Sequence, residues 1–218
     1  MKKIGIITYN KPHLKTQQVL NNILYKYDLY LIISPFKKFK KKKSIFKHRP
    51  YQFVGKSPKG LAKKYKLKIY DIKDIKKLNF IDFFLICGAG IIEKKNIIKN
   101  KMINCHSGII PQSRGLDSFK WAIYKLRRVG LTLHFIDKNI DLGKIIYQVV
   151  TPLSKNDDLK NFADKHYNLE INLLSNFENY LDSKVKLLFK KEKPNLRIPL
   201  FKEKELEKKF TKYKEKYL

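Results

Sequence analysis

Apolar and polar positions change along this chain in short blocks, and the blocks predict strands that alternate with helices. Nearly unbroken apolar runs predict buried strands over residues 4–9, 29–33, 67–70, 80–87 and 102–106. Helical spacing of apolar positions, or a flanking Gly, Pro or Asp, predicts helices over residues 16–27, 58–66, 72–78, 93–99, 118–127 and 157–181. Two further strands, over residues 131–136 and 144–150, are expected to pair. This order predicts an α/β fold, a doubly wound and mostly parallel sheet.

Two stretches depart from this alternation. Residues 36–56 are polar and basic without a clear period, which indicates a long loop. The end of the chain predicts an extended stretch over 194–199 and a charged helix over 202–216. One side of that helix is apolar, and we expect it to pack either on this domain or on a partner subunit; its members are Leu206, Phe210 and Tyr213.

The length of 218 residues suits one α/β domain with a small appendage. We therefore expect a folded domain over residues 1–181 and a basic extension over 182–218. The formal net charge is +30, from 49 Lys and Arg against 19 Asp and Glu, and such a charge favours polyanions, anionic membranes or phosphorylated substrates. Because lysines are scattered throughout and only residues 37–43 form a dense block, we interpret the charge as a compositional bias. A nucleic-acid partner is not expected, while an anionic small molecule remains compatible.

Cysteine usage and hydropathy bear on the compartment. The two cysteines, Cys87 and Cys105, lie in apolar runs and form no CxxC pair, which is typical of a reduced cytoplasmic protein. The first apolar run is too short for a signal peptide. The longest nearly apolar stretch, residues 80–92, contains Asp82 and two glycines, so no membrane span is expected.

Polar side chains gather where a central strand ends. Asn104 and His106 are two residues apart, so they share one face of the predicted strand, at the carboxyl end where open α/β sheets bind ligands. A single histidine or asparagine in such a place is more often structural than functional. The pair, followed by Gly108 and Pro111, favours a functional site.

Asp141 is the third candidate. An aspartate before a leucine and a glycine is commonly only a turn residue. However, the preceding pattern Gly130-x-Thr132-x-His134 predicts a strand beside Asn104–His106, and that strand would bring the carboxylate toward the imidazole. A carboxylate beside an imidazole favours the protonated ring.

Taken together, Asn-x-His followed by Pro111, then Arg114-Gly115, Gly-x-Thr-x-His and Asp-x-Gly, resemble the formyltransferases that use 10-formyltetrahydrofolate. That family includes glycinamide ribonucleotide transformylase, methionyl-tRNA formyltransferase and the sugar-nucleotide N-formyltransferases. The resemblance is dense over residues 87–150 and diffuse over residues 1–86. It implies a Rossmann-like formyltransferase fold, with the catalytic domain in residues 1–181.

The resemblance also implies roles. Asn104 would orient the formyl group, His106 would act as the acid that stabilises the oxyanion, and Asp141 would assist removal of the proton from the attacking amine. Transfer would be direct, without a metal and without a Ser or Cys nucleophile. The co-substrate 10-formyltetrahydrofolate would lie against Gly88, Ala89, Gly90, Ile91 and Ile92, and against the loop with Asp137 and Ile140. The Gly88-Ala89-Gly90 run is not a dinucleotide motif, because Glu93 stands in place of its third glycine.

The identity of the amine follows mainly by elimination. Residues 8–13 lack the Gly-rich phosphate loop that the resemblance would place there in a glycinamide ribonucleotide enzyme. The stretch after Val150 is too short for the β-barrel of the tRNA enzymes. Arg114-Gly115 with Trp121 is similar to enzymes that act on 4-amino sugars, although Trp121 also suits a helix core. A nucleotide-linked amino sugar is therefore the leading prediction, with Lys11, His13 and Arg114 as candidate contacts.

Alternatives remain open at this point. The amine could belong to methionyl-tRNA or glycinamide ribonucleotide, or the chain could be a non-catalytic nucleic-acid-binding protein on the same fold that uses residues 37–43 and 202–216. A protein on this fold that had lost its enzymatic activity would not be expected to keep Asn104, His106 and Asp141 together. The resemblance also suggests a homodimer formed through C-terminal elements.

Overall fold

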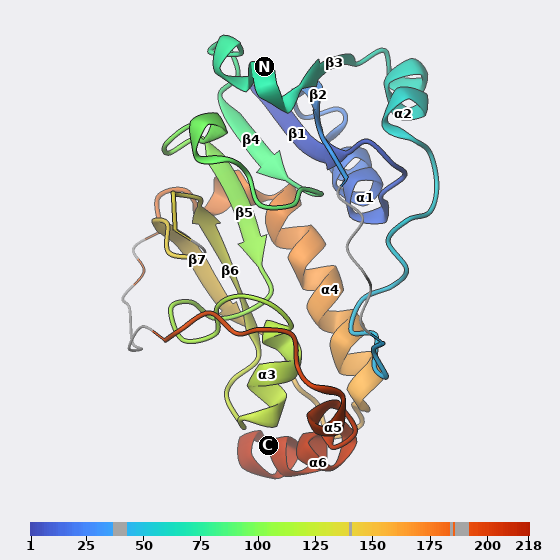
Figure 1. Ribbon diagram of the computed structural model, residues 1–218, viewed down its shortest axis with the longest axis vertical. Helices are drawn as coiled ribbons and strands as arrows, with labels where there is room; N and C mark the ends of the chain where they lie inside the picture. Colours follow the sequence, from blue (N-terminus) through green and yellow to red (C-terminus); the bar gives the residue numbers. More distant parts are fainter. Residues whose placement is uncertain (37–42, 140, 184, 186–191) are drawn as a thin grey trace.

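A seven-stranded sheet forms the centre of the protein. The computed structural model describes residues 1–36, 43–139, 141–183, 185 and 192–218 (Figure 1). The sheet order is β3-β2-β1-β4-β5-β6-β7. The strands are β1 (Lys3–Tyr9), β2 (Asp28–Ser34), β3 (Lys68–Asp71), β4 (Phe83–Ile86), β5 (Met102–His106), β6 (Gly130–Phe135) and β7 (Ile145–Val150). Pairing is parallel from β3 to β5 and antiparallel from β5 to β7, which confirms the predicted α/β fold and the pairing of its last two strands.

Helices cover the sheet unequally. The helices are α1 (Leu14–Ile23), α2 (Pro58–Tyr65), α3 (Ser118–Tyr124), α4 (Leu159–Ser175), α5 (Leu200–Glu203) and α6 (Leu206–Tyr217). Short 3-10 turns are η1 (Ile72–Lys77), η2 (Lys94–Asn96) and η3 (Phe177–Tyr180). Side chains of α1, α2 and α4 pack on one face of the sheet, whereas η1 packs on the other. No helix in the described part of the chain is both long and apolar enough to cross a membrane.

Several predicted helices differ at their ends from those observed, and two differ most. The helix over residues 93–99 is wrong, because only the single turn η2 forms there. Its first residues are exposed and polar, so they offer no apolar stripe to bury. The helix over 157–181 is shorter at both ends. Asp158 caps it by accepting a hydrogen bond from Asn161 N (2.6 Å), and it ends before Asn176, whose φ of −116° leaves the helical region.

The C-terminal helix packs on this domain. Leu206, Phe210 and Tyr213 are buried against Phe119 of α3 and Phe162 of α4, and the hydroxyl of Tyr213 accepts a hydrogen bond from Val129 N (3.0 Å). The sequence left open whether the apolar side of this helix packs on its own domain or on a partner subunit. In the structure it packs on its own domain. The basic block over residues 37–43 lies almost wholly outside the described residues.

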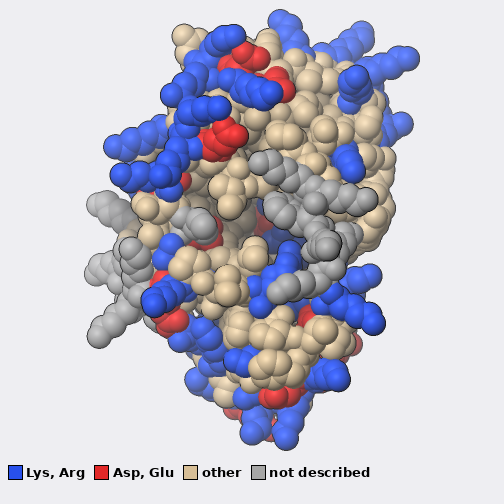
Figure 2. Space-filling model, viewed as in Figure 1, with Lys and Arg blue, Asp and Glu red and all other residues tan. Residues whose placement is uncertain are grey.

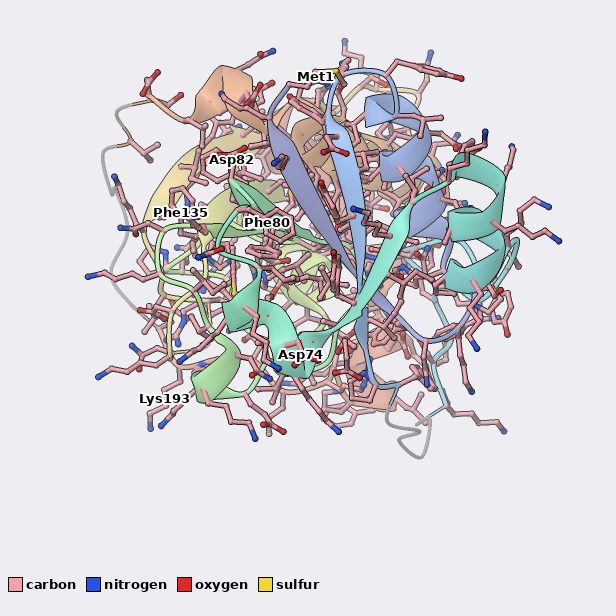
Figure 3. All side chains as sticks on the ribbon, turned by 90° about the horizontal axis from the view of Figure 1, so that it is seen from above. Met1, Asp74, Phe80, Asp82, Phe135 and Lys193 are labelled. Atoms are coloured by element: carbon pink, nitrogen blue, oxygen red, sulfur yellow. The ribbon has the colours of Figure 1, made fainter. Side chains whose placement is uncertain are left out.

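The carboxyl ends of the parallel strands lie near the middle of the molecule. Figure 1 shows β1, β4 and β5 running from the end that holds the N-terminus toward the level of α3, and the C-terminal segment crosses below them. Met1 and Asp82 lie near the start of β1 in the view from above (Figure 3), where Asp82 accepts a hydrogen bond from Lys3 N (2.8 Å). The amino ends are thus occupied by backbone contacts, and the polar candidates gather at the opposite ends.

Candidate active site

Asn104 and His106 lie on the same face of β5, as the period of a strand requires. Ile103 and Cys105 point the other way, into the cluster with α1 and α4. Across the strand pair, Asn104 lies opposite His134 and His106 lies opposite Thr132. The strand predicted beside Asn104–His106 is therefore present as β6, and it adds two polar side chains to the same face.

The imidazole of His106 is held from one edge. Its Nε2 lies 2.8 Å from the carbonyl oxygen of Ser113, which can only accept, so we assign the hydrogen to Nε2. The hydroxyl of Ser118 lies 3.2 Å from the same nitrogen and donates to Gly115 O (3.1 Å). With Nε2 occupied in this way, the Nδ1 edge is the one that faces Asp141 and any ligand.

Asp141 lies across a short gap from that edge. Its Oδ1 is 3.5 Å from His106 Nδ1, and the two side chains are 14% and 8% exposed, respectively. The separation is longer than a usual hydrogen bond, so the two groups approach each other without engaging fully. The other oxygen, Oδ2, accepts a hydrogen bond from Gly115 N (2.8 Å). A ligand oxygen would have to reach Nδ1 from beside this gap, because 3.5 Å leaves no room for an atom between the two side chains.

His134 fixes the amide of Asn104. Asn104 Nδ2 lies 3.3 Å from His134 Nε2, and His134 Nδ1 donates to Phe135 O (3.1 Å). Burial, together with the nearby His106 ring, lowers the pKa of His134 to about 4. The ring is therefore neutral at pH 7, and its Nε2 accepts from the amide. The sequence marked His134 only as part of a strand motif, since a support role of this kind needs the cross-strand register to be known.

Thr132 braces the loop that follows β5. Its hydroxyl donates to Gly108 O (2.8 Å) and accepts from Ile110 N (3.1 Å). A Cβ added at Gly108 would come within 2.5 Å of Ser113 O and 3.1 Å of His106 Nε2. The chain therefore passes so closely beneath the imidazole that only glycine fits, and this contact seals the Nε2 side of His106 against a ligand.

The residues expected to bind folate differ in how open their surroundings are. Gly88 is enclosed, since a Cβ there would lie 2.8 Å from Tyr9 and 2.9 Å from His13. Nothing lies within 4 Å of a Cβ built on Gly90, and Ile91 is 88% exposed, so this part of the segment is open to a ligand. The remaining members are Ala89, whose carbonyl accepts from the Tyr9 hydroxyl (2.8 Å), Ile92, half-buried against the η1 side of the sheet, and Asp137, which accepts from Asn139 N (2.7 Å). Ile140 lies outside the described residues.

A cavity of about 590 Å³ opens beside Leu142, the residue that follows Asp141. Its lining contains three cations and one carboxylate, on Arg114, Lys138, Lys193 and Glu192, and it is completed by Asn139, Leu142 and Pro194. Figure 2 shows that Lys and Arg side chains predominate over Asp and Glu on this face of the molecule, whose surface is hollowed near its middle. The lining of the cavity would favour an anionic group.

The three predicted substrate contacts fall in different surroundings. Arg114 is buried, donates from Nη1 to Glu192 O (2.9 Å) and lines the cavity. Lys11 is exposed, with its ammonium 4.7 Å from the ring of Phe36. Burial, aided by the charges of Lys15 and Arg49, lowers the pKa of His13 to about 4. His13 is then neutral at pH 7, which does not suit an ionic contact with phosphate.

A buried ionic group that the sequence did not reveal lies on α4. The Glu170 carboxylate is fully buried and binds Lys15 Nζ (2.6 Å) and Arg49 Nη2 (2.6 Å). Burial alone would raise its pKa, but Arg49 and Lys15 outweigh that effect and lower it to about 2. The three residues come from distant parts of the sequence, so no local pattern could have paired them. Among the residues described by the structure, no group of three His, Cys, Asp or Glu is placed to hold a metal ion.

Comparison with known proteins relates the chain to one family. Residues 78–177 match the model for formyl transferase. A methionyl-tRNA formyltransferase from Mycoplasmopsis pulmonis is 32% identical over 123 residues, which are 51% of this chain and 42% of that protein. The chain thus spans less than half the length of this curated relative.

Solved structures share the fold. Phosphoribosylglycinamide formyltransferase from Streptococcus pneumoniae aligns with 84% of this chain and 100% of its own, at 17% identity and a TM-score of 0.59. An N-formyltransferase from Helicobacter canadensis aligns with 83% of this chain and 64% of its own, at 21% identity and a TM-score of 0.60. The strands that carry Asn104, His106 and His134 therefore lie within residues 78–177, the segment that is similar to the formyl transferase model.

Proposed function

We propose that this protein transfers a formyl group from 10-formyltetrahydrofolate to a primary amine, with Asn104, His106 and Asp141 as its catalytic residues. The observation that carries the proposal is the arrangement around His106. Nε2 is occupied by Ser113 O, Nδ1 faces Asp141 across 3.5 Å, and the amide of Asn104 stands two residues away on the same strand face. In this proposal, the His106 ring and the Asn104 amide supply two donors from one strand face, and Asp141 supplies a carboxylate beside the ring.

The geometry supports direct transfer. The amine nitrogen attacks the formyl carbon and a C–N bond forms, which places negative charge on the formyl oxygen. A proton on His106 Nδ1 and the Asn104 amide are suitable donors for that oxyanion. The attacking nitrogen loses a proton to Asp141, directly or through water. Collapse of the adduct then breaks the bond to folate N10, which takes up a proton, so charge and atoms balance.

The amine is proposed to belong to a nucleotide-linked amino sugar. The Helicobacter canadensis structure is described as a complex with folinic acid and dTDP-3-aminofucose, and its fold matches this chain. The cationic cavity beside Leu142 would suit a phosphate-bearing substrate. Glycinamide ribonucleotide is the second candidate, because this chain covers the whole length of the Streptococcus pneumoniae enzyme. A cytoplasmic location is part of the proposal, and the two buried free thiols, Cys87 and Cys105, fit a reducing compartment.

The test is a formyl-transfer assay followed by absorbance, as tetrahydrofolate is released. The amine panel contains 3-amino and 4-amino sugars linked to dTDP, UDP and GDP, glycinamide ribonucleotide and methionyl-tRNA. We expect turnover with at least one nucleotide sugar. Activity with only glycinamide ribonucleotide or methionyl-tRNA would reassign the substrate. No turnover with any amine of the panel would refute formyl transfer.

Variants of the site test the residue assignment. His106→Asn and Asp141→Asn should each lower kcat by about 10²-fold or more, as the loss of a preorganised group does, without a change in melting temperature. Asp164→Asn is the matched control, because Asp164 lies on the surface of α4 and pairs with Lys160 four residues away. Near-normal rates in both site variants would refute the catalytic assignment.

A further inference from the structure

Residues 192–198, here called the C-terminal strap, cross the rim of the candidate site. Figure 1 shows this segment, in red, passing between the carboxyl ends of the strands and α3 before it reaches α5. The strap lies in the part of the chain, residues 182–218, that the sequence predicts to be a C-terminal basic extension. Its main-chain hydrogen bonds join it to Arg114 and Leu116, in the loop that follows His106.

The position of Asp141 depends on one backbone amide. Asp141 has a left-handed φ of 49°, and its Oδ2 accepts a hydrogen bond from Gly115 N (2.8 Å) while Oδ1 faces His106. A carboxylate on a loop has several rotamers, and a single strong donor selects among them. Where Gly115 points its N–H therefore decides where Asp141 holds its charge.

The strap fixes Gly115 from the other side. Asn195 N donates to Arg114 O (2.8 Å), and Leu116 N donates to Asn195 O (2.9 Å), so the two segments pair like parallel strands around Gly115. Gly115 has a φ of +84°, and a Cβ built on it would come within 2.5 Å of Asn195 O. The strap thus lies directly on this glycine, in a conformation that other residues rarely adopt.

Side chains of α3 and its N-cap anchor the strap in turn. Trp121 Nε1 donates to Leu196 O (2.7 Å), and the carboxylate of Asp117 accepts from Ile198 N (3.2 Å). Ile198 is buried in the cluster that α3 and α6 share. The strap is therefore connected to the packed core at one end and to the catalytic loop in its middle.

We propose that the C-terminal strap is a positioning element of the active site, because it holds the Gly115 amide in the orientation that directs the Asp141 carboxylate toward His106. This inference rests on the proposed function for its kinetic readout. The role proposed for Asn195 needs no contact with substrate, whereas Glu192, Lys193 and Pro194 of the strap also line the cationic cavity. The strap acts through main-chain hydrogen bonds, so the identity of its side chains is secondary.

The test compares two substitutions at one position. Asn195→Pro removes the N–H that binds Arg114 O, whereas Asn195→Ala keeps it, and both lose the contact between Asn195 Oδ1 and Lys125 Nζ (3.3 Å). We expect Asn195→Pro to lower kcat by about 10-fold or more, because a misplaced catalytic group lowers turnover rather than binding. The KM for the formyl donor and the KM for the amine should each stay within about 3-fold of the wild-type value. Asn195→Ala should stay within about 2-fold of wild type.

A double-mutant comparison separates positioning from general damage. In an Asp141→Ala background, Asn195→Pro should cause no further loss in single-turnover rate, because the group that the strap positions is already gone. An equal loss in both backgrounds, or a wild-type kcat in Asn195→Pro, would overturn the proposal. If Asn195→Pro does not fold, Trp121→Phe removes the bond to Leu196 O and keeps an aromatic ring for the contacts with Tyr124, Lys125 and Lys202. It should lower kcat in the same pattern, and a wild-type rate would then refute the proposal.

A measurement without substrate keeps this inference distinct from the proposed function. The ring nitrogen resonances of His106, recorded by long-range 1H–15N NMR, should move in the same direction in Asn195→Pro and Asp141→Ala and stay in place in Asn195→Ala. Unchanged resonances in Asn195→Pro would contradict the positioning role, whether or not any amine is formylated. Wild-type inactivity with moved resonances would instead refute only the proposed reaction.

Discussion

Acidification should destabilise this protein well above the pH at which carboxylates titrate, because burial keeps four histidines as neutral rings. Burial is the main cause in each case: it lowers the pKa of His13 and His134 to about 4, that of His166 to about 3, and that of His48 well below its usual value. His166 illustrates the reason, since its two nitrogens contact Thr151 Oγ1 (2.7 Å) and Ser107 Oγ (2.8 Å) in a buried site. Protonation would place a charge there, and the nearby Glu170 carboxylate, which favours that charge, is already paired with Lys15 and Arg49.

The sign and size of the effect follow from linkage. Each folded-state pKa lies below the unfolded value of about 6.5, so the unfolded chain binds more protons at lower pH, and stability is lost as pH falls from about 6.5 toward 4. Between pH 7.5 and 5.5 the loss is about 1.3 kcal/mol for each ring, or about 5 kcal/mol for four. A typical domain has only about 5–15 kcal/mol in total, so the change should be large.

Urea unfolding followed by circular dichroism at a series of pH values measures this loss directly. His166→Gln, which removes one of the four rings, should reduce the pH dependence by about a quarter. A free energy of unfolding that stays constant between pH 7.5 and 5.5 would refute the account of buried neutral rings. A loss confined to pH below about 4.5 would assign the effect to carboxylates instead.

Two further predictions concern support residues. His134→Leu removes the acceptor that holds the Asn104 amide, and it should lower kcat by about 10-fold while KM changes little; a wild-type kcat in the same formyl-transfer assay would show that Asn104 needs no such partner. Glu170→Gln leaves the buried Lys15 ammonium without its counter-ion and should cost about 3 kcal/mol in urea unfolding. Pairing it with Lys15→Met should restore most of that loss, and a double variant no more stable than the single one would contradict the ion-pair explanation.

The strand that contains Asn104 and His106 could be predicted from the sequence because its signal is local. Asn104 and His106 stand two apart in an apolar run, and the period of a strand puts them on one face whatever the rest of the chain does. The neighbouring strand from Gly130 to His134 was also predictable, since consecutive strands joined by a short helix commonly pair. The ends of helices were less predictable. Asn176 ends α4 through its backbone conformation, and no Gly or Pro in the sequence marks that end.

Other parts of the site depend on contacts that leave no mark in the sequence. The strap binds through main-chain groups around Asn195, which any residue other than proline could supply, and only the glycine at 115 hints that something lies close to it. The burial of His13 was likewise hidden, because it follows from the packing of Tyr9 and Phe53 around the ring. Residues separated widely in sequence are brought together by tertiary packing, which a period of two or of 3.6 does not encode.

The order in which the chain is made gives the strap one more consequence. Asn195 leaves the ribosome long after Gly115 and Asp141, so for part of translation the catalytic loop exists without the segment that pairs with it. Contacts between such distant residues form late in folding, because a large loop must close first. A nascent chain released before the strap emerges would hold the sheet and the three polar side chains, and yet it would lack the contact that fixes Gly115.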